Sequence, residues 1–217
     1  MACSCCAGEA LDIFGEKSAR RALRRYLRNG LGGADAKRIA AWAADGGLGG
    51  ATVIEIGGGI GQLQAELVSR GAERGTVVEV VAGYERPARE LADALGITDR
   101  STFLLADLVE TPDAVVPADI VVLRRVVCCS PVGPSVLAAA ASRTRRTLLS
   151  SYPRDRPAVR AVIRLQNAVL ALMRKRFRIF VHPPGELARA AEEHGLRLTR
   201  ISRDAVWETA QFDVAAS

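Results

Sequence analysis

The sequence predicts an α/β fold with a doubly wound, mostly parallel sheet. From residue 51 onward, short β-branched runs alternate with helical segments, a pattern typical of βαβ units. The chain has 217 residues and no internal repeat or low-complexity linker. This length suits one such domain. We therefore expect an α/β domain over residues 51–217, preceded by an N-terminal arm with helices over residues 1–50.

The first two expected helices lie in this N-terminal part. Apolar residues recur at helical spacing over residues 17–29, and Asn29-Gly30 ends the segment. A second helix is expected over residues 34–44, and the glycines of residues 46–50 break the chain after it.

The alternating part of the chain predicts five strands with helices between them. Strands are expected at residues 52–56, 76–81, 102–105, 119–123 and 147–151. Helices are expected at residues 60–68, 86–95 and 135–143.

The last third departs from simple alternation. A long apolar helix is expected over residues 157–175, followed by a strand-like run at 177–181. A helix over 186–194 stops at Gly195. Residues 196–202 and 205–214 then predict an antiparallel hairpin at the sheet edge.

The composition is that of a folded globular protein. Hydrophobic residues make up 49% of the chain, which argues against disorder. The longest stretch without a charge is interrupted by Pro131, Gly133 and Pro134, so we expect no membrane span and no membrane partner. The cysteines are few and odd in number, and the N-terminus lacks a secretory pattern. The expected location is the cytoplasm.

The net charge of +6 comes mostly from arginine and favours anionic partners. Several arginines lie on the helix expected at 17–29, but Tyr26 is its only aromatic residue. Base stacking is therefore weakly supported, and nucleic acid is not the expected partner. We favour a solvated face, or a lid over an acidic substrate, with Tyr26 as a candidate pocket residue.

A glycine-rich turn follows the first expected strand, with the sequence Glu55-Ile56-Gly57-Gly58-Gly59-Ile60-Gly61. Glycines let the backbone turn tightly and approach a ligand. Gln62 stands where a dinucleotide-binding loop needs its third glycine, which argues against a nicotinamide or flavin site. An acidic residue two positions before G-x-G-x-G resembles motif I of the class I S-adenosylmethionine-dependent methyltransferases.

Further residues extend this resemblance in the expected order. Glu79 lies at the second strand, where a carboxylate can accept both ribose hydroxyls. Asp107 follows the third strand, where an acidic residue of the family binds the adenine amino group. The fourth strand would end beneath the methyl donor. The resemblance implies a Rossmann-like sheet of seven strands, with S-adenosylmethionine as cofactor and S-adenosylhomocysteine as product. The implied cofactor residues are Glu55, Gly57, Gly58, Gly59, Gly61, Glu79, Val80, Asp107, Leu108 and Arg124.

The residues at the end of the fourth expected strand indicate which kind of methyltransferase the chain resembles. The N/D-P-P-Y/F signature of enzymes that methylate base or glutamine amino groups is absent. The run from Arg125 to Pro131 and the later run from Phe177 to Pro183 resemble a small-molecule branch. This branch includes magnesium-protoporphyrin O-methyltransferase and bacterial relatives. Ser130 replaces a tyrosine that is frequent in those relatives, so the acceptor stays open.

The resemblance implies methyl transfer to O, N or S of a small molecule, with specialised-metabolite biosynthesis as the expected context. Two alternatives stay open: an RNA methyltransferase, and a cofactor-binding pseudo-enzyme or partner subunit without turnover. The acceptor atom, the oligomeric state and the use of a general base are not indicated, and a homodimer is compatible with the sequence.

Few side chains are candidates for the chemistry itself. His182 lies in the insertion 152–183, and we expect this insertion to cover the substrate together with the N-terminal arm. His182 is either a base that contacts the substrate or a structural residue. Arg124 and Arg125 leave the fourth strand at the site, and guanidinium groups bind carboxylates bidentately. We therefore expect an anionic acceptor. The alternative is that these arginines pair with aspartates or backbone carbonyls.

The cysteines form two clusters whose spacing does not match a zinc site. We expect no metal site, and we expect Cys128 or Cys129 to be a small buried or pocket-lining residue. The remaining cysteines are Cys3, Cys5 and Cys6.

Overall fold

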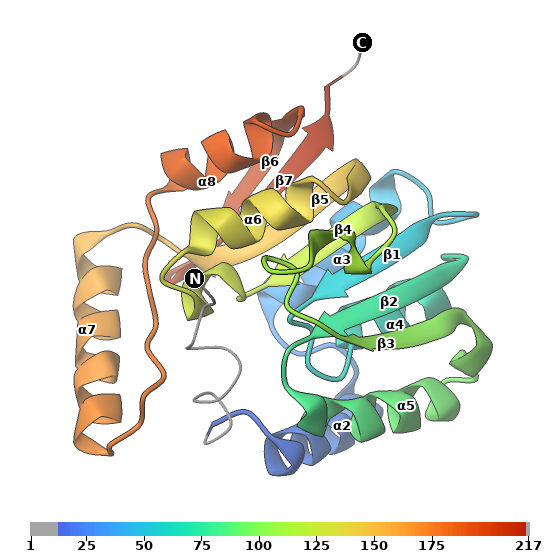
Figure 1. Ribbon diagram of the computed structural model, residues 1–217, viewed down its shortest axis with the longest axis horizontal. Helices are drawn as coiled ribbons and strands as arrows, with labels where there is room; N and C mark the ends of the chain where they lie inside the picture. Colours follow the sequence, from blue (N-terminus) through green and yellow to red (C-terminus); the bar gives the residue numbers. More distant parts are fainter. Residues whose placement is uncertain (1–12, 216–217) are drawn as a thin grey trace.

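The computed structural model describes residues 13–215 and shows a seven-stranded sheet with helices on both faces (Figure 1). The strands are β1 (Thr52–Ile56), β2 (Arg74–Glu79), β3 (Ser101–Leu105), β4 (Ala118–Arg124), β5 (Thr144–Pro153), β6 (Leu196–Arg203) and β7 (Trp207–Val214). Their spatial order is β3-β2-β1-β4-β5-β7-β6. The first five strands are parallel, and β7 pairs antiparallel with both β5 and β6. The doubly wound sheet and the terminal hairpin are thereby confirmed.

The helices lie close to their expected positions. They are α2 (Glu16–Asn29), α3 (Ala34–Asp45), α4 (Gln62–Ser69), α5 (Glu85–Ala94), α6 (Gly133–Ala141), α7 (Pro157–Leu172) and α8 (Pro184–Glu192). Helix α7 ends before the expected residue 175 because Arg174 adopts a left-handed φ of 56°. Lys175 then donates its N–H to the Leu170 carbonyl, which closes the helix end.

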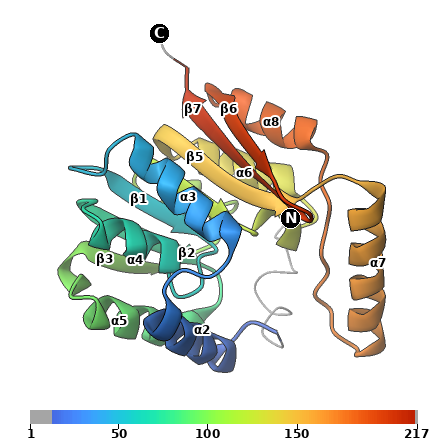
Figure 2. The same ribbon diagram turned by 180° about the vertical axis from the view of Figure 1, so that it is seen from behind.

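The central strands are buried on both faces, so their apolar residues alternate between two cores. Val53 and Val122 pack with α2, α3, α4 and α5 on one face, which Figure 2 shows in front. Ile54 and Leu123 pack with α6 and α8 on the other face. Helices α2 and α3 thus share a core with the α/β domain.

The order of the strands reverses between β1 and β4. Ligands of open α/β sheets bind outside the carboxyl ends of the strands at such a switch point. The glycine-rich turn follows β1 and Arg124 ends β4, so both lie at this point.

The run at residues 177–181, expected to be strand-like, is not a strand. Its backbone bonds to side chains and loops: Ile179 donates to Asn167 Oδ1 (2.9 Å), and Phe180 donates to the Cys128 carbonyl (2.8 Å). The segment therefore crosses from α7 to α8 without joining the sheet. In the described part of the chain, no helix is long and apolar enough to cross a membrane.

Candidate active site

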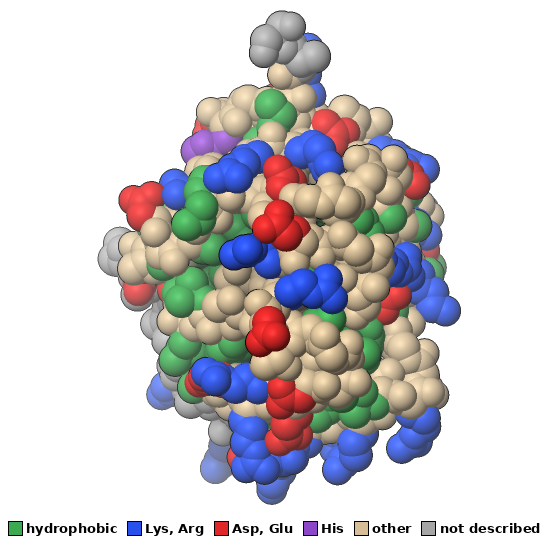
Figure 3. Space-filling model, turned by 90° about the vertical axis from the view of Figure 1, so that its right-hand side faces the viewer, with side chains coloured by type: hydrophobic (Ala, Val, Ile, Leu, Met, Phe, Trp, Pro, Cys, Tyr) green, Lys and Arg blue, Asp and Glu red, His purple; other side chains and the backbone are tan. Residues whose placement is uncertain are grey.

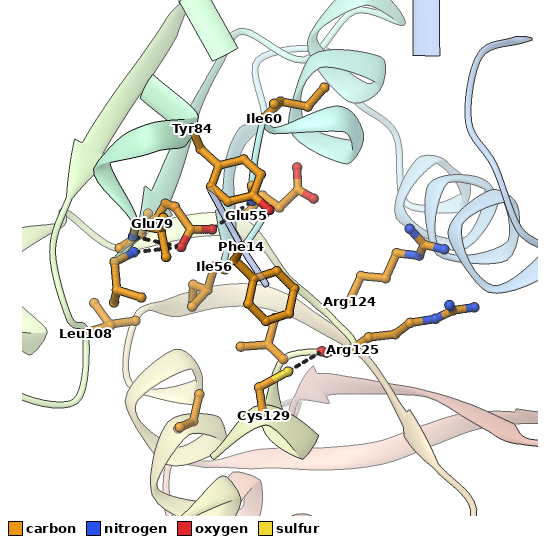
Figure 4. Close-up of a pocket in the computed structure, with 18 of the residues that line it drawn as sticks. Phe14, Glu55, Ile56, Ile60, Glu79, Tyr84, Leu108, Arg124, Arg125 and Cys129 are labelled. Atoms are coloured by element: carbon orange, nitrogen blue, oxygen red, sulfur yellow. Dashed lines mark hydrogen bonds between the residues drawn. The ribbon is translucent and has the colours of Figure 1, made fainter. Parts of the chain in front are cut away.

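A cavity of about 420 Å³ lies at the carboxyl ends of β1, β2, β3 and β4 (Figure 4). Its size is in the range of small-molecule sites. Most residues implied by the sequence resemblance line it: Glu55, Gly57, Gly58, Gly59, Glu79, Val80, Asp107, Leu108, Arg124 and Arg125. These residues lie far apart in the sequence, and the parallel strands bring them together.

The glycines of the turn meet different steric limits. Gly59 has a φ of 60°, and a Cβ there would lie 3.0 Å from the Tyr84 ring. Gly61 has a φ of 73°, and its Cβ would lie 2.3 Å from Val77 Cγ2. Gly61 does not line the cavity. Its lack of a side chain lets α4 begin close against β2.

Glu79 is buried at the end of β2, with its carboxylate fixed by three backbone N–H groups. Oε2 accepts from Gly59 (2.9 Å), and Oε1 accepts from Val80 (2.8 Å) and Val81 (3.1 Å). Burial raises the pKa of Glu79, while these N–H groups oppose the rise. A carboxylate has about four acceptor sites, so one remains for a ligand hydroxyl.

Glu55 is the second-last residue of β1, and its side chain is buried beneath the glycines. Its Oε2 accepts the Gln64 backbone N–H at 2.8 Å, in the first turn of α4. Burial raises the pKa of Glu55 to about 7, although the backbone N–H groups and the charge of Arg124 oppose the rise. A ligand cation placed here would favour the ionised form.

Asp107 follows β3 and is half-buried at the cavity wall. Its Oδ1 accepts the Val109 N–H at 2.9 Å, which leaves Oδ2 for a ligand. Leu108 and Val80 add apolar surface to the cavity wall, which suits an aromatic ligand.

Arg124 and Arg125 line the cavity with their stems, but both guanidinium groups bind Asp35 of α3. Arg124 Nε and Nη2 lie 2.9 and 3.1 Å from the Asp35 oxygens, and Arg125 Nε and Nη2 lie 2.8 and 3.0 Å away. Figure 4 shows the two side chains extending side by side, away from Glu79. Burial raises the pKa of Asp35, but the hydrogen bonds and charges of the arginines outweigh it and hold this pKa low.

The structure therefore favours the alternative interpretation of these arginines, in which they pair with an aspartate, and that aspartate is Asp35. The Asp119 carboxylate accepts hydrogen bonds from Thr52, and Asp155 binds Arg160. The backbone of Arg125 has a left-handed φ of 59°. Its guanidinium carbon Cζ lies 4.1 Å from the centroid of the Trp207 ring.

His182 and Tyr26, the other candidates for catalysis, do not line the cavity. The His182 ring is buried, with Nε2 3.0 Å from the Val127 carbonyl and 2.9 Å from the Ser130 carbonyl. The Tyr26 hydroxyl donates to Glu66 Oε2 at 2.7 Å. Burial and this carboxylate raise the pKa of Tyr26. Neither side chain faces the cavity, so a catalytic role for His182 or Tyr26 stays an untested prediction.

The cavity also contains residues that the sequence reasoning did not single out as site residues. Phe14 precedes α2, Phe177 follows α7, and their rings pack edge to face. Arg25 of α2 reaches the cavity and has no ion-pair partner among residues 13–215. Aromatic residues make up only 5% of the chain, so each of them is a candidate pocket residue. Phe14 could have been singled out on this basis.

Cys129 lines the cavity and Cys128 is buried beside it, as expected of small pocket residues. Cys129 Sγ donates to the Arg125 carbonyl at 3.3 Å. Within residues 13–215 there is no group of three His, Cys, Asp or Glu side chains able to hold a metal ion. The cluster Cys3, Cys5 and Cys6 lies outside the described residues.

No known protein-family profile matches the chain, and no curated protein matches it either. Many solved structures do. Magnesium protoporphyrin IX methyltransferase from Synechocystis PCC 6803, with bound SAH, matches with a TM-score of 0.71 at 18% identity, over 94% of this chain and 97% of that one. An O-methyltransferase family protein from Burkholderia thailandensis matches with a TM-score of 0.71 at 17% identity, over 92% of this chain and 59% of that one.

Another match is a putative methyltransferase in complex with the Haloferax volcanii Trm112 activator. It has a TM-score of 0.69 at 14% identity, over 96% of this chain and 97% of that one. The chain therefore has the fold of the class I methyltransferases, as the sequence resemblance predicted.

Proposed function

We propose that the protein is an S-adenosylmethionine-dependent methyltransferase that transfers a methyl group to O, N or S of a small molecule. The observation that carries this proposal is the convergence of Glu55, Glu79 and Asp107 with the glycine turn around one cavity. Similar solved structures support it, since magnesium protoporphyrin IX methyltransferase was solved with bound SAH and with bound SAM.

The residues present fit this cofactor. Glu79 keeps one acceptor site, which suits one ribose hydroxyl. A Cβ at Gly57 would lie 2.8 Å from Val126 Cγ2 and one at Gly59 would lie 3.0 Å from the Tyr84 ring, so glycines there keep these two wall residues in place. Glu55 would stabilise the amino group of the ligand, and Asp107 the adenine amino group. S-adenosylmethionine supplies an electrophilic methyl group when it is bound.

The protein's part in such a transfer is alignment and exclusion of water. Phe14 and Phe177 cover the cavity with apolar surface, and Val126 and Val136 add to its wall. A general base is needed only if the acceptor must lose a proton during attack. With His182 bound to backbone carbonyls, we propose that positioning dominates the catalysis.

The anionic acceptor stays a proposal, but it now rests on the net charge of the cavity wall and not on arginines free to bind the acceptor. Arg124 and Arg125 share the single carboxylate of Asp35, so this cluster keeps a net positive charge at the cavity wall. Arg25 adds a second cation at the wall. We propose an acceptor with an apolar body and one acidic group. Specialised-metabolite biosynthesis stays a proposal; the solved relatives include mitomycin 7-O-methyltransferase, with a TM-score of 0.62 at 23% identity, over 92% of this chain and 59% of that one.

The test is calorimetric titration of the purified protein with S-adenosylmethionine and S-adenosylhomocysteine. We expect micromolar binding of both, weakened about tenfold or more by Glu79→Gln, because a neutral amide loses a charge-assisted hydrogen bond. Glu73→Gln is the matched control, since Glu73 is exposed near the start of β2 and does not line the cavity. Failure of the wild-type protein to bind either compound would refute the cofactor assignment.

RNA methylation is the second candidate, and the surface of α2 favours it. Lys17, Arg21, Arg24 and Arg28 are exposed on this helix. Figure 3 shows Lys and Arg side chains gathered along the lower edge of one face, over α2 and α5. Acidic side chains lie between them, which weakens the attraction for phosphates. Retention of RNA that falls steeply with salt would favour this candidate, and cofactor binding without transfer to any extract would favour a non-catalytic partner subunit.

A further inference from the structure

Helix α7 has an apolar face that no other part of the described chain covers. Only Val159 and Ile163 of this helix are buried. The exposed fractions are 52% for Val162, 67% for Leu165 and 85% for Leu172. Figures 1 and 2 both show α7 standing beside the sheet and its two helical layers. Contiguous exposed apolar surface of this kind marks an interaction site.

The opposite side of α7 is fixed to the protein. The Asn167 side chain binds the Ile179 backbone twice, donating to its carbonyl at 2.8 Å and accepting its N–H at 2.9 Å. Leu165 lies two residues from Ile163, and Val169 lies two residues from Asn167, which is a rotation of about 200° around the helix. Leu165 and Val169 therefore point away from the body of the protein.

The charges of this segment have one sign. Between residues 157 and 185 every charged side chain is basic: Arg160, Arg164, Arg174, Lys175, Arg176 and Arg178. Arg160 pairs with Asp155, which precedes the helix. An exposed apolar face flanked only by basic residues complements a surface that is apolar inside and negatively charged outside.

We propose that α7 docks the protein on a lipid bilayer that contains anionic headgroups. The helix would lie in the plane of the interface, with Leu165, Val169 and Leu172 among the acyl chains and Arg164 and Arg174 at the phosphates. This proposal departs from the expectation of no membrane partner. An interfacial helix does not span the bilayer, so it needs no long apolar segment.

Pairing with a second copy of the chain is the competing use of this face. Val162, Leu165, Val169 and Leu172 have the spacing of a coiled-coil seam. A pair of such helices would bring basic side chains together with no acidic residue of the segment between them. This repulsion favours the lipid surface.

Docking would also place a wall of the cavity beside the lipid. Phe177 follows α7 by a few residues, lines the cavity and contacts Phe14. An amphiphilic acceptor could then pass from the bilayer to the cavity over apolar surface. The docking itself does not depend on the proposed function.

The experiment is sedimentation of the full chain with vesicles of phosphatidylcholine alone, or with about a quarter phosphatidylglycerol, at low and high salt. We expect binding to the anionic vesicles that falls with salt. Leu165→Glu and Val169→Glu should each weaken it about tenfold or more, because a charge then enters the apolar face. Val116→Glu is the matched control, since Val116 is 74% exposed and lies outside α7.

The basic residues have a control of their own. Arg164→Glu should weaken binding to the anionic vesicles more than Arg197→Glu, which makes the same change at an exposed position of β6. Unchanged circular dichroism and melting temperature would show that every variant folds. The proposal is overturned if the wild-type protein binds neither vesicle, or if Val116→Glu weakens binding as much as Leu165→Glu. It is also overturned if light scattering shows a dimer that Leu165→Glu dissociates, with no vesicle binding.

Discussion

Phe14 and Phe177 pack edge to face, with ring centroids 5.2 Å apart and ring planes at 83°. Phe14 lies on the chain that enters α2, and Phe177 on the chain that returns from α7. Both rings line the cavity, so this contact joins the N-terminal arm to the 152–183 insertion over the site. The structure is thus compatible with the expectation that these two segments cover the substrate.

Removing one ring should affect the acceptor more than the cofactor. For Phe177→Ala we expect KM for the acceptor to rise about threefold to tenfold, because such ring pairs contribute about 0.5–1.5 kcal/mol beyond their buried area. The dissociation constant of S-adenosylhomocysteine should stay within about twofold. Phe177→Leu keeps the apolar cover and serves as the control. Equal effects on acceptor and cofactor would contradict the covering role.

Glu55 should make the protein less stable as pH rises. Burial raises its pKa to about 7 in the folded state, above the 4.5 of the unfolded chain. The folded protein then holds a proton that the unfolded chain releases, so this contribution is complete below pH 4.5 and is lost as pH rises through 7.

The expected loss is up to about 3 kcal/mol, since one pKa unit corresponds to about 1.4 kcal/mol. Urea unfolding across this pH range measures it, and Glu55→Gln should remove this part of the slope. Parallel curves for the variant and the wild-type protein would show that Glu55 does not titrate in this window.

Asp35 should be important for stability. Its carboxylate is 1% exposed and binds two guanidinium groups, so Asp35→Asn leaves both arginines without their counter-charge. We expect a loss of about 2–4 kcal/mol in the free energy of unfolding, measured with urea. Asp155→Asn breaks the more exposed pair with Arg160 and should cost clearly less, because solvent screens exposed ion pairs. Similar losses for the two variants would contradict this view of Asp35.

His182 should act on stability and not on the pH profile of turnover. Its ring holds the turn between Val127 and Ser130 through their carbonyl groups. His182→Ala should lower the free energy of unfolding by about 1–3 kcal/mol, because buried acceptors lose their donor. His182→Gln, which keeps a donor, should recover part of this loss. A variant of normal stability whose turnover loses its dependence on pH would restore His182 as a base.

Much of the fold could be predicted from the sequence because its signals are local. Strand and helix periods, together with glycine turns, placed the elements of the sheet to within a few residues. The acidic residues at the carboxyl ends of β1, β2 and β3 could be assigned to one site because the carboxyl ends of parallel strands share an edge. Their roles toward the cofactor stay predictions.

The features that could not be predicted depend on contacts between residues far apart in the sequence. Residues 177–181 are as apolar as a strand, but Asn167 and Cys128 take their backbone hydrogen bonds. Arg124 and Arg125 were expected to face an acceptor, and Asp35 binds them from α3. No local pattern connects these partners, because a pairing across the fold depends on how the helices pack.

The pairing of Asp35 with the end of β4 also limits how such proteins can be recombined. A crossover at the glycines of residues 46–50 would divide the chain at a natural break in secondary structure. It would nevertheless separate Arg124 and Arg125 from their carboxylate and remove Leu23 and Ile39 from the core. Chimeras that exchange N-terminal segments between relatives should therefore be more stable when the incoming segment carries an acidic residue at the position of Asp35.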